Sequence, residues 1–163
     1  MEMNTKLGKE LSIYSLGIGL VYIVLGLLEL LRGLSEAFGL EWALMQISTV
    51  LVYPDIFSGI TLSIIGFVFL FGVMPQWKAS KDATSYLVVG TLLSAVFFGV
   101  YLAIMGAHAL GSGVYLIAPE AYADIFADWA EWSWLGDMRA GIWLFAFVLP
   151  GLYLTLKLWR VKK

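Results

Sequence analysis

The sequence contains no cysteine and few charges, and each shortage excludes a class of function. None of its 163 residues is cysteine, which rules out disulfides, thiolate metal sites, iron–sulfur clusters and cysteine nucleophiles. Charged residues make up 13% and hydrophobic residues 61% of the chain, against roughly 25% and 45–50% in soluble domains. No basic stripe indicates nucleic acid as a partner. The composition is that of a membrane protein.

Ionisable side chains are also scarce in the middle of the apolar runs. The polar residues there are hydroxyls, namely Tyr22, Thr61, Ser63, Thr91, Ser94 and Tyr101. Proton relays and voltage sensors place ionisable groups in this zone, so a proton-coupled pump is not indicated. The chain also lacks a nucleophile–base pair, a phosphate loop and a dinucleotide fingerprint. We therefore predict no catalytic residue and no cofactor, which leans against an enzyme without excluding one.

Four long apolar runs are present, at about residues 11–31, 56–74, 86–110 and 140–158. A helix needs about 20 apolar residues to cross a bilayer, and only helices or closed barrels can span one. Because the runs are continuous rather than alternating, they predict helices. We expect an all-α, polytopic membrane protein: a single integral membrane domain over residues 1–163, built as a four-helix transmembrane bundle. Membrane lipids are its first partners.

The third run lacks a formal charge from Tyr86 to Ala118, apart from whatever His108 carries. That stretch is too long for one upright span at about 1.5 Å per residue. We therefore expect the span to end near Gly111-Ser112-Gly113. The residues that follow would lie at the membrane interface.

Two connecting segments, at about residues 35–53 and 114–137, are predicted to form short amphipathic helices on the outer side of the bundle. In the second, Pro119 suits a helix start and Gly136 a helix end. Acidic residues recur there every three or four positions, at Glu120, Asp124, Asp128 and Glu131. This face is either solvated or a docking surface for a basic partner or for cations.

The basic residues orient the protein in the membrane. If the N-terminus is inside, eight of the ten lysines and arginines lie on the inner side, and only Arg32 and Arg139 lie outside. This asymmetry follows the positive-inside rule. We expect a multi-pass protein of the cell membrane with both termini cytoplasmic.

A candidate ligand pocket is predicted near the outer ends of the helices. Glu29 lies almost across the membrane from Leu11, at about 1.5 Å per residue, and Arg32 follows one turn later, where the two can pair. One interpretation is an interfacial pair with side chains reaching water. The other is an outward-facing pocket, for which the candidate residues are Glu29, Arg32, Tyr101, His108 and Asp137.

A metal site is the weaker interpretation of the same residues. His108 is the only histidine in the chain, and a lone histidine is a poor basis for haem or a histidine-rich site. Mixed nitrogen and oxygen ligation with Glu29, Glu36, Asp55 or Asp137 is conceivable. The spacing has no specific metal signature, so we predict no metal ligand.

Glycines recur every seven residues, which is two helical turns, and so form stripes on single helix faces. The sets are Gly19, Gly26 and Gly33; Gly59 and Gly66; and Gly99 and Gly106. Small residues let helix backbones approach closely in lipid. We expect these glycines to pack helices within the bundle, or one stripe to form an interface with another subunit.

Pro150 and Gly151 fall near the middle of the fourth apolar run. Proline removes one helical hydrogen bond and clashes with the preceding turn, so a kink is expected. The kink is either a packing feature or a hinge.

Three functional hypotheses follow. The first is a non-catalytic subunit or scaffold of a membrane complex, self-associating or joined to another membrane subunit. The second is a small carrier or binding component, with a transport role, for a neutral or lipid-like solute held in an outward-facing pocket. The third is an interfacial membrane enzyme in which Glu29, His108 and Asp137 would have to converge within hydrogen-bond reach.

Overall fold

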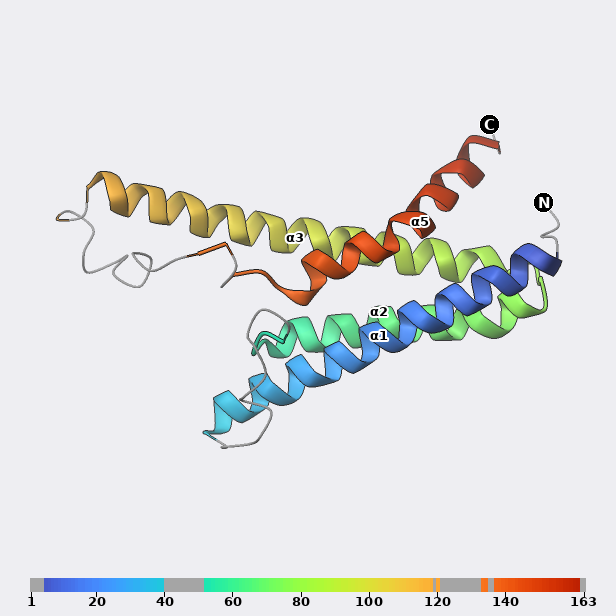
Figure 1. Cartoon of the computed structure of the whole chain (residues 1–163), viewed down its shortest axis with the longest axis horizontal. Coiled ribbons are helices and arrows are strands. Elements are labelled where there is room, and N and C mark those ends of the chain that lie inside the picture. Colours follow the sequence, from blue (N-terminus) through green and yellow to red (C-terminus); the bar gives the residue numbers. More distant parts are fainter. Residues whose placement is uncertain (1–4, 40–51, 119, 121–132, 135–136, 162–163) are drawn as a thin grey trace.

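The structure is a computed structural model that describes residues 5–39, 52–118, 120, 133–134 and 137–161, with only the backbone described for residues 155–161. Four helices make up most of this part of the chain (Figure 1). They are α1 (Thr5–Phe38), α2 (Ile56–Trp77), α3 (Ala83–Ile117) and α5 (Ala140–Val161). The prediction of an all-α bundle of four apolar helices is confirmed.

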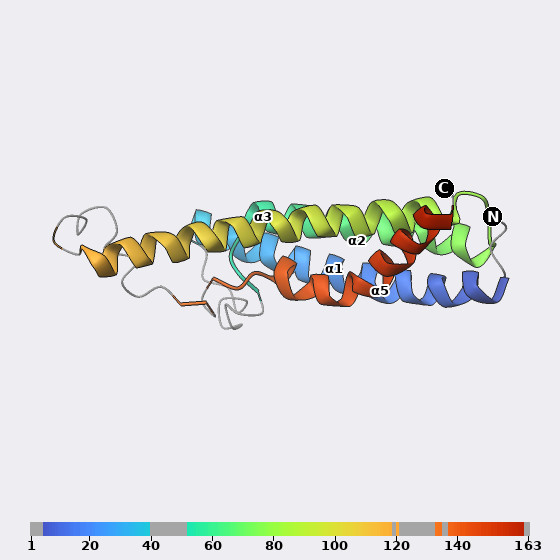
Figure 2. The same cartoon turned by 90° about the horizontal axis from the view of Figure 1, so that it is seen from above.

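Three of these helices, α1, α2 and α3, are long and apolar enough to cross a membrane. The described apolar part of α5, Ala140–Leu154, is shorter. Helix α3 continues past Gly111-Ser112-Gly113 to Ile117, while the expected end of the membrane span at these residues stays a prediction. A glycine inside a helix costs only about 1 kcal/mol, which does not end a helix that apolar residues continue on both sides. The distal part of α3 therefore projects beyond the other helices (Figures 1 and 2).

Both chain termini lie at the same end of the bundle (Figures 1 and 2). We call the opposite end, where α2 starts at Ile56 and α5 starts at Ala140, the distal end. Contacts are most extensive between α1 and α2, moderate between α2 and α3 and between α3 and α5, and slight between α1 and α5. The bundle is thus closely packed between α1 and α2 and only loosely joined between α1 and α5.

The tight α1–α2 contact is built on glycine. A Cβ atom at Gly26 would lie 2.8 Å from the carbonyl oxygen of Gly59, and one at Gly66 would lie 2.7 Å from the carbonyl oxygen of Gly19. A Cβ atom at Gly33 would lie 2.9 Å from the backbone nitrogen of Ile56. These backbones approach closely because no side chain separates them.

The α3 glycines do not pack against another helix among the described residues, so an interface with another subunit, the other expected role, stays a prediction. A Cβ atom at Gly99 or at Gly106 would meet no atom within 4 Å. These residues lie on a face of α3 that no described element covers. Their spacing matches that of the packed glycines, but spacing alone does not determine which face a neighbouring helix covers.

The interior combines apolar packing with hydroxyl pairs. The buried apolar side chains come from all four helices and include Tyr22, Leu62, Ile65, Phe69, Leu87, Leu144 and Val148. The Tyr22 and Ser94 hydroxyl groups are 2.5 Å apart, which links α1 to α3. The Tyr14 hydroxyl donates to the carbonyl oxygen of Phe147 at 2.9 Å, linking α1 to α5.

Helix α5 changes direction partway along its length in both views (Figures 1 and 2). Pro150 lies inside this helix. Proline removes one hydrogen bond of the helical ladder, which is the usual cause of such a bend.

The two expected interfacial helices fall largely outside the described residues. Of the acidic positions, Glu120 is described and exposed. The others, Asp124, Asp128 and Glu131, lie outside the described residues, so the docking surface stays a prediction.

Candidate functional site at the distal end

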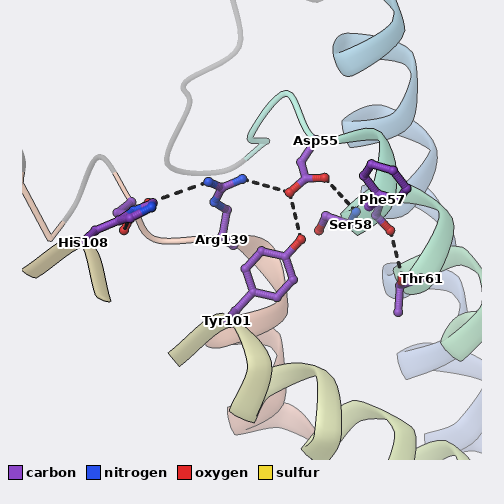
Figure 3. A network of polar contacts seen from close by, with 8 residues as sticks. Asp55, Phe57, Ser58, Thr61, Tyr101, His108 and Arg139 are labelled. Carbon is purple, nitrogen blue, oxygen red and sulfur yellow. Dashed lines mark hydrogen bonds and ion pairs between the residues drawn. The ribbon is translucent and has the colours of Figure 1, made fainter. Parts of the chain in front are cut away.

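Asp55 joins three helices at the distal end (Figure 3). It precedes α2 as the N-cap, and its Oδ1 accepts a hydrogen bond from the backbone nitrogen of Ser58 at 2.9 Å. Its Oδ2 accepts one from the Tyr101 hydroxyl of α3 at 2.8 Å and one from Nη1 of Arg139, just before α5, at 2.9 Å. The short side chain thus caps one helix and holds the other two to it.

We call Asp55, Tyr101, His108, Asp137 and Arg139 the distal cluster. Arg139 lies between its two halves (Figure 3). Besides its ion pair with Asp55, its Nη2 lies 3.7 Å from Oδ1 of Asp137. Its guanidinium carbon lies 3.4 Å from the centroid of the Tyr53 ring, a cation–π distance. The arginine side chain is only 11% exposed, so its charge depends on these partners.

His108 and Asp137 form the other half. The Nδ1 atom of His108 is 2.8 Å from Oδ2 of Asp137, and the side chains are 35% and 8% exposed. A carboxylate at this distance holds the imidazole with an N–H at Nδ1. Glu29 is not part of this half, but it is close enough to Asp55 for the two carboxyl groups to influence each other.

Glu29 is fully buried, with 0% of its surface exposed. Among the described residues, no group makes a well-formed hydrogen bond to either of its carboxyl oxygens or to the hydroxyl oxygen of Ser58, another residue with 0% exposure. The Ser58 hydroxyl and the backbone amides of Tyr53 and Ala140 nevertheless lie close to the carboxyl group as potential donors. Since Ala140 opens α5, the carboxyl group faces the start of that helix, where amide groups lack partners within the helix.

The expected Glu29–Arg32 pair is not formed. Nη1 of Arg32 donates to the carbonyl oxygen of Val52 at 2.7 Å, and no ion pair within 4.0 Å joins Arg32 to Glu29 among the described side chains. The segment before α2 passes over this end of α1 and offers the arginine a backbone carbonyl. Of the five predicted pocket residues, the structure therefore brings Tyr101, His108 and Asp137 into one network, with Glu29 beside it.

One cavity lies at the cluster and another lies between α1 and α5. A pocket of about 440 Å³ is lined by Gly33, Glu36, Ala37, Tyr53, Pro54, Asp55, Ile56, Phe57 and Arg139. A second, apolar groove of about 640 Å³ runs between α1 and α5. Its wall includes Tyr14, Gly17 and Tyr22 on one side and Trp143, Ala146 and Pro150 on the other.

Sequence reasoning missed Arg139 and Ser58 and treated Asp55 only as an accessory metal ligand. A signal for Asp55 was present, since an aspartate immediately before an apolar run is typical of a helix N-cap. The sequence also contained a signal for Arg139, because a cation at the start of a helix is disfavoured unless a carboxylate accompanies it. Among the described residues, no group of three or more acidic or histidine side chains could hold a metal ion by itself.

The fold and the buried polar cluster define an integral membrane protein with multiple apolar helices. The match to a family model agrees, since the MJ0565 integral membrane domain model covers residues 5–158. The chain belongs to this family. The chain is 27% identical to the uncharacterized protein MJ0565 of Methanocaldococcus jannaschii over 124 residues, which are 76% of this chain and 74% of that protein. No solved structure matches the chain.

Proposed function

We propose that the protein is a non-catalytic membrane component that binds an amphipathic, lipid-like solute. The observation that carries this proposal is the groove of about 640 Å³ between α1 and α5. The groove would hold the apolar part of the solute, and the distal cluster around Asp55 and Arg139 would face its polar part.

The position of the groove supports this arrangement. Trp143 lines its wall on α5, one turn after Arg139 and Ala140 at the start of the helix. On α1, Tyr22 lines the groove two turns before Glu29. An apolar chain in the groove would therefore end close to the charged cluster. The indole nitrogen of Trp143 finds no hydrogen-bond partner in the described part of the chain, and buried indole N–H groups usually have one.

The loose side of the bundle supports binding and release. α1 and α5 meet in few places, whereas backbone contacts lock α1 to α2. Pro150 lines the groove from within α5. A bend at this proline would let the two halves of α5 move separately, as broken helices do in carriers, so we propose Pro150 and Gly151 as the hinge.

We further propose that the distal cluster faces the outside of the cell and both termini the cytoplasm. Eight of the ten basic residues then lie inside, as the positive-inside rule requires. A solute would enter the groove from the outer leaflet or from the lipid facing α1 and α5.

Native mass spectrometry of the protein extracted gently from its own membrane tests the proposal. Gly17 lines the groove and Gly99 lies on the uncovered face of α3, and a Cβ atom at either position meets nothing within 4 Å. Gly17→Phe and Gly99→Phe are therefore matched variants. We expect a bound small molecule on the wild type and on Gly99→Phe, and its loss from Gly17→Phe. A wild type without adduct, or equal adduct on all three, would refute the proposal.

A second candidate is a structural subunit of a larger assembly. It is favoured by Gly99 and Gly106, which leave open space on α3 where another helix could approach closely. The partner is a second copy of the chain or another membrane subunit, with Glu120 and the acidic positions after it as a further docking surface. In the same spectra, a multimer or hetero-complex lost only in Gly99→Phe would support this role.

A further inference from the structure

The charges at the distal end do not balance. Among the described residues, the buried and half-buried charged side chains at this end are three carboxylates and two guanidinium groups: Glu29, Asp55, Asp137, Arg32 and Arg139. Arg139 pairs with both aspartates, at 2.9 Å and 3.7 Å, and Arg32 donates to a backbone carbonyl. If the imidazole of His108 is not counted, these five side chains together carry one excess negative charge. The carboxylate without a cationic partner is Glu29.

Oxygen atoms without a well-formed hydrogen bond gather at this carboxylate. Within the described part of the chain, both Glu29 oxygens and the Ser58 hydroxyl oxygen lack such a bond, and both residues are 0% exposed. The Ser58 hydroxyl lies beside the Glu29 carboxyl group, and Asp55 is the neighbouring charge. Oδ1 of Asp55 accepts one hydrogen bond, from Ser58 nitrogen, which leaves it a second lone pair.

A buried carboxylate without a partner is destabilising, so such groups are normally paired or neutral. Carboxylate and hydroxyl oxygens are the ligands that hard cations prefer. A single excess negative charge suits a monovalent ion rather than a divalent one. The amides of Tyr53 and Ala140 near Glu29 do not exclude an ion, since a carboxylate offers about four lone-pair positions.

We propose that Glu29, Ser58 and Asp55 bind a monovalent metal cation, for which sodium is the probe. The site joins α1 to the start of α2 and lies against the start of α5. Its route of access is the pocket lined by Gly33, Glu36 and Asp55. The proposal does not depend on what occupies the groove between α1 and α5.

Thermal unfolding of the purified protein in NaCl and in choline chloride, at equal ionic strength, tests the site. A ligand that binds only the folded state raises the unfolding temperature with its concentration. We expect a saturable rise in sodium that choline does not give. Equilibrium dialysis with radioactive sodium should find one ion per chain.

Three variants locate the effect. Glu29→Gln removes the excess charge and should abolish the sodium dependence. Ser58→Ala removes only a hydroxyl ligand and should raise the sodium concentration needed for half the effect several-fold, which keeps the test decisive if Glu29→Gln does not fold. Glu10→Gln is the control, since this carboxylate is exposed on α1 at the opposite end of the bundle, and it should behave as the wild type. Equal unfolding temperatures in sodium and choline, or an unchanged sodium response in both Glu29→Gln and Ser58→Ala, would overturn the proposal and leave a proton as the neutralising group.

Discussion

Replacement of Gly59 by alanine should separate α1 from α2, and Gly99→Ala is its matched control. A Cβ atom at Gly59 would lie 2.6 Å from the carbonyl oxygen of Gly26 and 2.7 Å from Cα of Leu30, whereas ordinary contact begins at 3.4 Å. Both neighbours are backbone atoms, so no side chain can rotate away. The helices must therefore move apart by at least roughly 0.8 Å, the difference between 3.4 and 2.6 Å, and overpacking of this kind costs about 1–3 kcal/mol.

The two variants share the gain in helix propensity, up to about 1 kcal/mol for glycine to alanine. Their difference in unfolding free energy therefore isolates the helix–helix clash, and Gly59→Ala should be the less stable by about 1–3 kcal/mol. Reversible unfolding in mixed micelles, followed by tryptophan fluorescence and circular dichroism, measures this difference. Equal stability of the two variants would refute the close α1–α2 contact.

Three further predictions concern the distal cluster, the bend and the orientation. Asp55→Asn keeps a capping side chain but leaves Arg139 without its partner at 2.9 Å, so it should lower the unfolding free energy by about 1.5–3 kcal/mol. Asp55→Ala also loses the cap and should be less stable again by about 1 kcal/mol. Equal stability of the wild type and Asp55→Asn would contradict the network. Pro150→Ala should straighten α5 and change the spin–spin distance between labels at Gly17 and Tyr153, whereas an unchanged distance would mean that the bend has another cause. Single cysteines at Lys6 and Lys81, in a chain that has no other cysteine, should react with impermeant thiol reagents only from the cytoplasm, and one at Glu36 only from outside; the reverse pattern would overturn the orientation.

The helices could be predicted because each apolar run is long enough to span a membrane by itself. The α1–α2 glycines were also accessible, since a period of seven residues places Gly19, Gly26 and Gly33 on one face of a helix. The same pattern at Gly99 and Gly106 does not show whether that face packs within the chain or against another subunit. Whether a face is covered depends on where the neighbouring helices lie, and one sequence does not contain that information.

For the same reason, the distal cluster could be predicted from the sequence only in part. Tyr101, His108 and Asp137 could be grouped from their expected depth in the membrane. The pairing of Asp55 with Arg139 joins residues 84 positions apart, and it depends on α2 and α5 starting side by side. Arg32 was predicted to pair with Glu29 because the two residues lie one turn apart. In the structure, Arg32 instead donates to a backbone carbonyl of the segment before α2.

An experimental structure of the protein in nanodiscs made from its own lipids tests the central claim most directly. The claim predicts elongated density in the groove between α1 and α5, passing Gly17 and Pro150 and ending near Trp143 and the Asp55–Arg139 pair. A groove closed by direct packing of α5 on α1, with no density between Tyr22 and Trp143, would contradict it.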